Sequence, residues 1–262
     1  MILTLEPGAD VAAVARALVA CGQWAKKLEG GGAVHFMIEA HSRAISDDEL
    51  ARIPGVAAVA KAASPHPRLD AQARTLEVAG VPFGHGEFPV LLAGPCSVES
   101  EERIREIAEQ VAEQGATFLR GGAMKPRTSP YSFTGHGDRA LRWLRDAADA
   151  HGLRVVTEAL GQDDLDAVAE HADLIQIGSR NMQNFALLRA AGRKARPVLL
   201  KRGLSATIEE WLLAAEHLLV HGAAGVILCE RGIRSFDPQT RNLLDLGAVS
   251  LLAHVHGLPV IV

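Results

Sequence analysis

The 262-residue sequence is poor in aromatic residues and has no excess of positive charge, and each shortage excludes a class of function. Aromatic side chains make up 4% of the chain, too few to suggest a platform that stacks nucleic-acid bases. The formal net charge of −4 argues against a general nucleic-acid or membrane-surface binder. No apolar run is long enough to cross a bilayer, so neither nucleic acid nor membrane is expected as a partner.

Cysteine is also scarce, because the chain has only Cys21, Cys96 and Cys229, far apart from one another. An odd number of distant cysteines does not suit a disulfide framework and is typical of a reducing compartment. Met1 leads directly into a strand-like MILTL with no basic segment, so no signal peptide is expected. We therefore expect a cytoplasmic protein, and the 48% hydrophobic content is ample for a globular core.

Residues 1–64 follow the order β-α-β-β-α-β. Asp10 is expected to cap the first helix, and Ser46 with Glu49 forms a capping box for the second. This order predicts a small ferredoxin-like α+β domain. We assign residues 65–89 to a linker and a hairpin, because residues 61–74 contain two prolines and little apolar periodicity.

From residue 90 onward, short apolar strands alternate with amphipathic helices. Seven strands are expected, at VLLAGPC, TFLRGG, RVVTEA, LIQIGS, PVLLKRG, GVILCERG and PVIV. Repeated βα units with continuous apolar strands predict an α/β fold with a parallel sheet, here a (β/α)₈ TIM barrel over residues 90–262. A doubly wound sheet is less favoured, since no G-x-G-x-x-G follows the first strand.

The length of this second region is short for a closed barrel. Such a barrel typically needs about 250 residues and rarely fewer than about 200. Residues 90–262 supply only seven of the eight strands, and an unclosed parallel barrel would expose two strand edges. We therefore expect a C-terminally truncated chain with an incomplete barrel.

Basic residues follow several of the predicted strands. In barrels of this type the chemistry lies at the carboxyl ends of the strands, which carry Arg120, Arg180, Lys201, Arg202 and Arg231 here. Cations crowded in a low-dielectric mouth repel one another unless anions neutralise them. A ligand with two phosphates, or with a phosphate and a carboxylate, would do so. The alternative is that some of the cations, Arg202 above all, pair with acids such as Glu158 or Glu230.

The segment KPRTSP raises the same question for the loop after the second of these strands. Pro126 and Pro130 stiffen the chain around Lys125 and Arg127, which is typical either of a rigid surface turn or of a preorganised anion site. Cys96 ends the first strand, where it is either a small core residue or a nucleophile or metal ligand. His136, beside the KPRTSP loop, is a weaker functional candidate.

Taken together, GPCSVES, LRGGAMKPRTSPYSFTG, VVTEALG, QIGSRNMQNF, VLLKRG and ILCERGIRSF resemble the motifs of 3-deoxy-D-arabino-heptulosonate 7-phosphate (DAHP) synthase. The resemblance is to the type I branch with an N-terminal ferredoxin-like domain, and it covers the chain from Phe88 onward. It implies a transferase of the shikimate pathway, the route to the aromatic amino acids. Such an enzyme condenses phosphoenolpyruvate with erythrose 4-phosphate, releases phosphate and forms a homo-oligomer.

The resemblance also implies roles for individual residues. Lys125 and Cys96 would be catalytic, and Cys96 would ligate a divalent metal ion of the Mn, Fe, Co or Zn class. Erythrose 4-phosphate would bind Lys125, Pro126, Arg127 and Thr128. Phosphoenolpyruvate would bind Arg120, Lys125, Ser179, Arg180, Lys201 and Arg231.

The chain departs from the family pattern in two respects. Ser179 stands where the family usually has alanine, and its hydroxyl offers one more donor. The family's other metal ligands, a His, a Glu and an Asp, would follow Val262, so we expect weak metal binding and little activity from this chain alone.

Two other functions stay open. One is a 3-deoxy-manno-octulosonate 8-phosphate synthase-like enzyme, and the other is a non-catalytic, phosphate-binding barrel relic. The N-terminal domain implies either feedback inhibition by an aromatic amino acid or a role in assembly alone.

Overall fold

A computed structural model of the chain describes residues 1–30, 33–39, 42–43, 45–60, 64–84, 89–126 and 129–262. The chain divides into two compact units, Met1–Ser64 and Pro65–Val262, and each is described by itself. In the described part of the chain, no helix is both long and apolar enough to span a membrane.

The smaller unit is an antiparallel sheet with two helices. Its elements are β1 (Ile2–Leu5), α1 (Val11–Ala20), β2 (Ala25–Gly30), β3 (Ala33–Ile38), α2 (Asp47–Ala51) and β4 (Val56–Ala60). The strand order β2-β3-β1-β4 confirms the predicted ferredoxin-like arrangement. Both predicted caps are present, since the Asp10 carboxylate accepts from the backbone N–H groups of Ala12 and Ala13, and Ser46 and Glu49 form a capping box.

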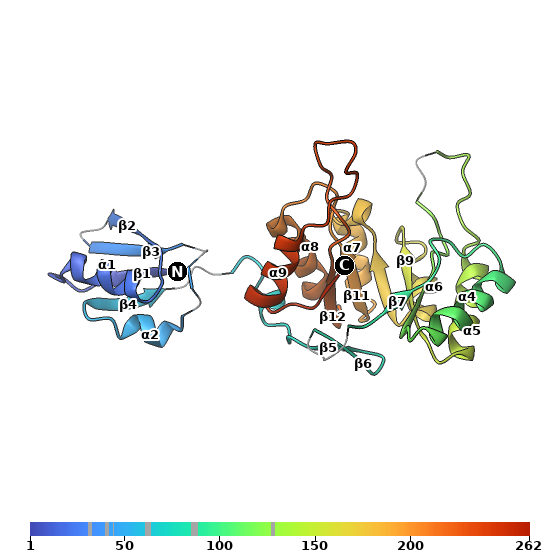
Figure 1. Cartoon of the computed structure of the whole chain (residues 1–262), viewed down its shortest axis with the longest axis horizontal. Coiled ribbons are helices and arrows are strands. Elements are labelled where there is room, and N and C mark those ends of the chain that lie inside the picture. Colours follow the sequence, from blue (N-terminus) through green and yellow to red (C-terminus); the bar gives the residue numbers. More distant parts are fainter. Residues whose placement is uncertain (31–32, 40–41, 44, 61–63, 85–88, 127–128) are drawn as a thin grey trace. The chain divides into compact units, whose positions relative to one another are not determined.

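The larger unit is built on a curled parallel sheet of seven strands, which confirms the predicted α/β barrel architecture (Figure 1). The strands lie side by side in chain order. They are β7 (Leu92–Ala93), β8 (Phe118–Arg120), β9 (Arg154–Ala159), β10 (Leu174–Ile177), β11 (Pro197–Lys201), β12 (Gly225–Cys229) and β13 (Val260–Ile261).

Helices connect these strands and cover one face of the sheet. They are α4 (Glu101–Glu113), α5 (Asp138–Ala150), α6 (Leu165–His171), α7 (Phe185–Gly192), α8 (Ile208–Val220) and α9 (Leu246–Ser250), with short turns η1 (Ser179–Asn181) and η2 (Leu251–Val255). Buried residues such as Leu141, Val155, Ile175 and Trp211 form one apolar core between sheet and helices. Because this layer is dry and continuous, it holds the strand ends in fixed positions.

The concave face of the sheet carries a second apolar cluster, which includes Phe118, Val156, Leu174, Leu199 and Ile227. Side chains on one face of a strand recur every two residues. The next positions on this face, toward the carboxyl ends, are therefore polar or small, namely Arg120, Glu158, Gln176, Lys201 and Cys229. A polar layer thus lies on an apolar floor, and it forms the base of the site described below.

A hairpin packs against this apolar floor. It consists of β5 (Leu76–Val78) and β6 (Val81–Phe83), as predicted, and Val78 and Phe83 belong to the inner cluster. The fit is close, because a Cβ on Gly225 would lie 2.4 Å from a methyl carbon of Leu76. The hairpin is therefore part of the barrel core.

Part of the segment assigned to the linker is helical. Pro67–Asp70 form a short helix, α3, which proline at its first position favours. The Glu216 carboxylate, on α8, accepts from the backbone N–H groups of Arg68 and Leu69 at 3.0 and 2.9 Å. No local pattern indicates this cap, because Glu216 is 148 and 147 residues from the two groups that it binds.

Candidate active site

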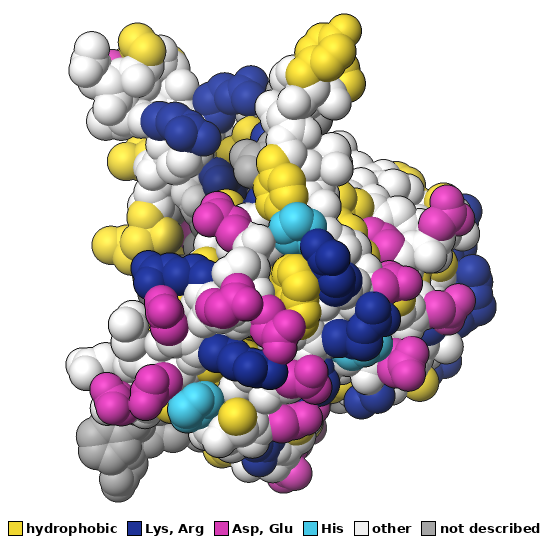
Figure 2. Space-filling model, turned by 90° about the vertical axis from the view of Figure 1, so that its right-hand side faces the viewer, with side chains coloured by type: hydrophobic (Ala, Val, Ile, Leu, Met, Phe, Trp, Pro, Cys, Tyr) yellow, Lys and Arg dark blue, Asp and Glu magenta, His cyan; other side chains and the backbone are white. Residues whose placement is uncertain are grey.

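A pocket of about 770 Å³ opens at the carboxyl ends of the parallel strands. Figure 2 shows Lys and Arg side chains gathered in a hollow between two projecting parts of the surface. The pocket brings together eight of the ten residues that the sequence singled out for binding or catalysis: Cys96, Arg120, Lys125, Pro126, Ser179, Arg180, Lys201 and Arg231. The other two, Arg127 and Thr128, lie outside the described residues.

The charge of the pocket is strongly one-sided. Seven cationic side chains line it, against the carboxylates Glu158 and Asp237 alone among the described residues. The cations are Arg120, Lys125, Arg180, Lys201, Arg231, Arg234 and Arg241. Such an excess in a concave site attracts anions, and guanidinium groups suit phosphate and carboxylate oxygens geometrically.

Cys96 and Lys125 meet at one side of the pocket. The Lys125 ammonium donates to the Cys96 sulfur at 3.0 Å and also to the Cys96 carbonyl oxygen. The hydrogen bond from Lys125 lowers the pKa of the Cys96 thiol, against the opposing effect of partial burial, and Arg120 adds to the lowering. Cys96 is solvent-exposed and Lys125 is buried, so the Cys96 sulfur faces the pocket beside a fixed ammonium.

The loop that carries Lys125 is held at both ends. Its backbone N–H donates to the Thr134 carbonyl at 2.8 Å, beside a bridge between Met124 and Gly135. His136 bonds the Glu99 carbonyl through Nε2 at 3.0 Å and packs edge-on against Phe133. His136 does not line the pocket, so the structure places this candidate beneath the loop as an anchor rather than at the reacting centre.

Gly122, just after β8, has no room for a side chain, because the chain there packs closely against the segment that carries Cys96. A Cβ on Gly122 would lie 2.8 Å from the Cys96 carbonyl oxygen and 3.2 Å from the Lys125 ammonium. Arg120 donates to the Pro95 carbonyl at 3.1 Å, which ties the end of β8 to the same segment. The GPC and RGG motifs are therefore adjacent in space and position Cys96, Arg120 and Lys125 as a group.

Lys201 and Glu158 lie in the polar layer at the base of the pocket. Burial lowers the pKa of Lys201, and the positive charges of Arg120 and Arg231 lower it further, although Cys229 and Glu158 oppose this. The Gln176 amide donates to Glu158 at 2.8 Å. Lys201 is consequently a cation that gains from any anion placed beside it.

Arg180 and Arg231 reach the pocket from η1 and from the segment after β12. Arg180 donates to the Pro126 carbonyl at 2.8 Å, so it links the end of β10 to the KPR loop. Arg231 donates to the Asn242 side-chain oxygen at 2.9 Å. Both guanidinium groups are oriented by neutral oxygens, and neither forms a salt bridge with a carboxylate of the described residues.

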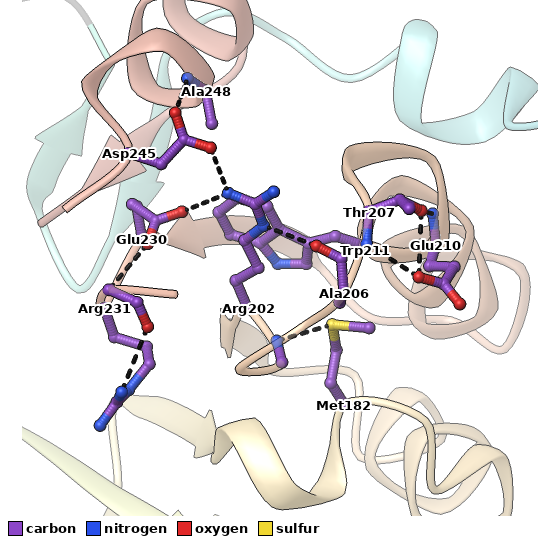
Figure 3. A network of polar contacts seen from close by, with 12 residues as sticks. Met182, Arg202, Ala206, Thr207, Glu210, Trp211, Glu230, Arg231, Asp245 and Ala248 are labelled. Atoms are coloured by element: carbon purple, nitrogen blue, oxygen red, sulfur yellow. Dashed lines mark hydrogen bonds and ion pairs between the residues drawn. The ribbon is translucent and has the colours of Figure 1, made fainter. Parts of the chain in front are cut away.

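Arg202 has a different role from its neighbours. It pairs with Glu230 at 2.8 Å and Asp245 at 2.9 Å and does not line the pocket (Figure 3). The alternative considered for this residue, pairing with an acid, is thereby confirmed.

Six polar residues of the pocket were missed from the sequence: Asn181 in η1, and Arg234, Ser235, Asp237, Arg241 and Asn242 in the segment that joins β12 to α9. Two arginines and an asparagine so soon after Arg231 were the available signal. Attention to the strand ends alone passed over them, because the segment folds back over the pocket before α9 begins.

The residues described do not form a metal site by themselves. No group of three His, Cys, Asp or Glu side chains in the described ranges could hold a metal ion. Among the described residues that line the pocket, Cys96 is the single soft ligand, and it lies against cations that would repel a divalent ion.

A parallel half-barrel with a cation-rich pocket at its strand ends is typical of the phosphate-binding (β/α)₈ class of proteins. Residues 65–262 match the model of the DAHP synthetase I family. This chain therefore belongs to that family, as its motifs implied. Enzymes of the family are generally metal-dependent.

Individual relatives agree with this assignment. The phospho-2-dehydro-3-deoxyheptonate aldolase of Thermotoga maritima is 54% identical over 187 residues, which are 71% of this chain and 55% of the relative. A 2-dehydro-3-deoxyphosphooctonate aldolase of Magnetococcus marinus is 32% identical, over 72% of this chain and 67% of the relative. The chain thus spans about half the length of the first relative and two thirds of the second.

Solved structures show the same fold. The crystal structure of the Thermotoga maritima DAHP synthase matches 99% of this chain and 78% of its own, with a TM-score of 0.71 and 42% identity. A truncated form of the Thermotoga maritima enzyme matches 71% of this chain and 67% of its own, with a TM-score of 0.64 and 49% identity.

Proposed function

We propose that this chain carries the phosphoenolpyruvate-binding site of a DAHP synthase, which condenses phosphoenolpyruvate with erythrose 4-phosphate and releases phosphate. One observation carries the proposal: seven cations from separate strand ends and loops line a single pocket with only two carboxylates among its described residues. Both substrates are anionic, and phosphoenolpyruvate has a phosphate and a carboxylate close together. Binding them offsets the mutual repulsion of the cations.

The proposed roles rest on the resemblance of the motifs and, for the described residues, on the lining of the pocket. Arg120, Lys125, Ser179, Arg180, Lys201 and Arg231 are proposed to bind phosphoenolpyruvate. Lys125 and Pro126, with Arg127 and Thr128 of the same motif, are proposed for erythrose 4-phosphate. Lys125 thus stands between the two substrates and is the proposed catalytic cation.

In the proposed reaction, the enol carbon of phosphoenolpyruvate attacks the aldehyde carbon of erythrose 4-phosphate, and the aldehyde oxygen becomes a hydroxyl. Water adds to the adjoining carbon, and phosphate leaves by cleavage of the C–O bond. The fixed ammonium and guanidinium groups stabilise negative charge as it develops on the aldehyde oxygen and on the leaving phosphate. Holding both substrates in one pocket also supplies the orientation that the bond formation needs.

Cys96 is the residue proposed as a ligand for the divalent metal on which the family generally depends. One thiolate beside an ammonium does not by itself suit such an ion, and no step above is routed through a metal. The three cysteines are free thiols, which supports a cytoplasmic setting.

The competing function is that of a 2-dehydro-3-deoxyphosphooctonate aldolase, in which a five-carbon aldose phosphate replaces erythrose 4-phosphate, because the product has eight carbons instead of seven. The identity of 54% to the heptonate enzyme, against 32% to the octonate enzyme, favours the first. The deciding experiment is calorimetric titration of erythrose 4-phosphate, and of a pentose 5-phosphate, into the chain with phosphoenolpyruvate present. Tighter binding of erythrose 4-phosphate supports the proposal, and a preference for the pentose phosphate would overturn it.

For the unit Met1–Ser64 we propose regulation by an aromatic amino acid within a homo-oligomer. Its sheet and two helices form a separate compact unit, which supports a separable role. Deleting residues 1–64 from an enzyme with a complete barrel is expected to abolish inhibition by the aromatic amino acid and leave turnover unchanged. If inhibition survives the deletion, the regulatory role is wrong and a role in assembly remains.

A further inference from the structure

The segment 231–244, between β12 and α9, supplies one side of the pocket and is called the arginine loop here. Arg231, Arg234 and Arg241 all belong to it. Among the described residues, one backbone–backbone hydrogen bond joins it to a segment distant in the sequence, from the Arg234 N–H to the Leu204 carbonyl at 2.7 Å. Its tip is open to solvent, since Phe236 is fully exposed. Whatever fixes the loop must therefore act mainly at its two ends.

Arg202 holds both ends at once. Its Nη1 donates to Glu230, immediately before the loop, at 2.8 Å, and to Asp245, immediately after it, at 2.9 Å (Figure 3). Its Nε donates to the Ala206 carbonyl at 3.0 Å, which fixes the guanidinium on its own segment. Glu230 and Asp245 are 15 positions apart in the sequence, yet one side chain joins them.

The three charged groups depend on one another. The Arg202 side chain is 7% exposed, that of Glu230 is fully buried and that of Asp245 is 29% exposed. A buried carboxylate without a cation is strongly unfavourable, so Glu230 stays in place only while Arg202 faces it. Asp245 also accepts from the Ala248 N–H and caps α9, which fixes where the loop ends.

Glu230 also fixes the backbone at Arg231. The second carboxylate oxygen of Glu230 accepts from the Gly232 N–H at 2.7 Å, across the peptide that carries Arg231. Gly232 has φ of +89°, and a Cβ there would lie 2.9 Å from the Asn242 Cβ, so the backbone turns tightly at this point. The Arg231 guanidinium then bonds Asn242 on the other side of the loop. Its direction is set by the Glu230 anchor.

We propose that Arg202 is a positioning residue for substrate binding: it joins the two ends of the arginine loop and thereby holds Arg231, Arg234 and Arg241 toward the pocket. Arg202 does not line the pocket, so it acts on the ligand only through the loop. The inference rests on the proposed function for its ligand, phosphoenolpyruvate. It predicts that loosening either end weakens anion binding at a distance.

The test is calorimetric titration of phosphoenolpyruvate, and of inorganic phosphate, into the full chain and its variants. Arg202→Met and Asp245→Asn are each expected to weaken phosphoenolpyruvate binding about tenfold or more, the effect of impairing one charge-assisted hydrogen bond to the ligand. Arg202→Lys keeps the charge but loses the planar guanidinium with its several donors. Its affinity for phosphoenolpyruvate is expected to lie between those of wild type and Arg202→Met. Asp245→Asn is nearly isosteric and keeps the test decisive if Arg202→Met fails to fold.

A matched control separates positioning from stability. Arg145 also bonds two carboxylates, Asp149 and Asp173, but it lies near the start of β9, at the other end of the strands from the pocket. Arg145→Met is expected to lower the melting temperature and leave phosphoenolpyruvate affinity unchanged. Hydrogen exchange supplies a second readout, because the Gly232 and Ile233 amides are expected to exchange faster in the Arg202 and Asp245 variants only.

Each outcome has one meaning. If wild type binds phosphoenolpyruvate and the Arg202→Met and Asp245→Asn variants bind it as tightly as wild type does, Arg202 has no positioning role and the proposed function is unaffected. If the Arg145 variant loses affinity as well, the effect is one of general stability and the inference fails. If wild type binds phosphate but not phosphoenolpyruvate, the proposed function fails, and the phosphate affinities of the variants still test the positioning role of Arg202. If wild type binds neither anion, both are wrong.

Discussion

The Lys125 ammonium lies 3.0 Å from the Cys96 sulfur, although the two residues are 29 positions apart and come from different loops. This contact joins the GPCS and KPRTS motifs at one point of the pocket. The contact also predicts a reactivity of Cys96 that can be measured without substrate.

Cys96 is expected to react as a thiolate at a lower pH than an ordinary thiol, because the hydrogen bond from Lys125 lowers its pKa. Burial raises the pKa of Cys229, which should react slowly. In a Cys21→Ser, Cys229→Ser background, the pH dependence of iodoacetamide alkylation measures Cys96 alone. Lys125→Met should move its midpoint upward. An unchanged midpoint would show that the contact does not govern the thiol.

Lys201 is expected to take up protons when an anion binds. Its pKa is lowered in the free chain, first by burial, and a bound anion favours the charged ammonium. Affinity should therefore be full below the lowered pKa and decline as the pH rises through it. Titrations of phosphoenolpyruvate in buffers of different ionisation enthalpy measure the uptake. Lys201→Arg, which does not titrate in this range, should abolish it; equal uptake in the variant would assign the proton elsewhere.

Gly178→Ala is expected to destabilise the barrel through a single clash. The backbone there is ordinary, with φ of −74°, but a Cβ would lie 2.1 Å from a Glu158 carboxylate oxygen. The clash is with the end of a flexible side chain, so Glu158 can move aside, and the cost is that of losing its hydrogen bond to Gln176, about 0.5–1.5 kcal/mol. Urea unfolding should show this loss of stability when Gly178→Ala is made in the wild-type chain, and a much smaller loss when it is made in a Glu158→Ala variant. Equal losses in both backgrounds would mean that another neighbour is responsible.

Gln72→Ala is expected to loosen the hairpin that packs on the barrel floor. The Gln72 amide donates to the Val226 carbonyl at 2.9 Å and accepts from the Val226 N–H at 2.7 Å, as a neighbouring strand would. Removing it leaves two backbone groups unpaired, at about 1–3 kcal/mol for each group that stays buried. Chemical denaturation should show a clear loss, and Gln110→Ala on exposed α4 should show almost none. Similar behaviour of the two variants would contradict a structural role for Gln72.

The strands and the charges at their ends could be predicted from the sequence, because both follow from local pattern. Runs such as PVLLK and GVILC read as buried parallel strands, and the carboxyl ends of parallel strands share one edge. Arg120, Lys201 and Arg231 could therefore be placed together before any coordinates were known. The caps at Asp10 and Ser46 were equally accessible, since a cap is decided within four residues.

Contacts between distant segments could not be predicted in this way. Nothing near Arg68 indicates that Glu216 caps α3, and nothing near Arg202 indicates that it joins both ends of the arginine loop. Arg234 and Arg241 enter the pocket because the loop folds back, which depends on those same contacts. Single-sequence patterns describe periodicity and termini, whereas such contacts are fixed only when the whole core packs.

The central claim is that cations from separate strand ends form one site for phosphoenolpyruvate, and a crystal structure of the chain soaked with this ligand tests it most directly. The result expected is density for one molecule whose phosphate and carboxylate lie within hydrogen-bond distance of Arg120, Lys125, Lys201 and Arg231. Density for phosphoenolpyruvate at another surface, with this pocket empty, would contradict it.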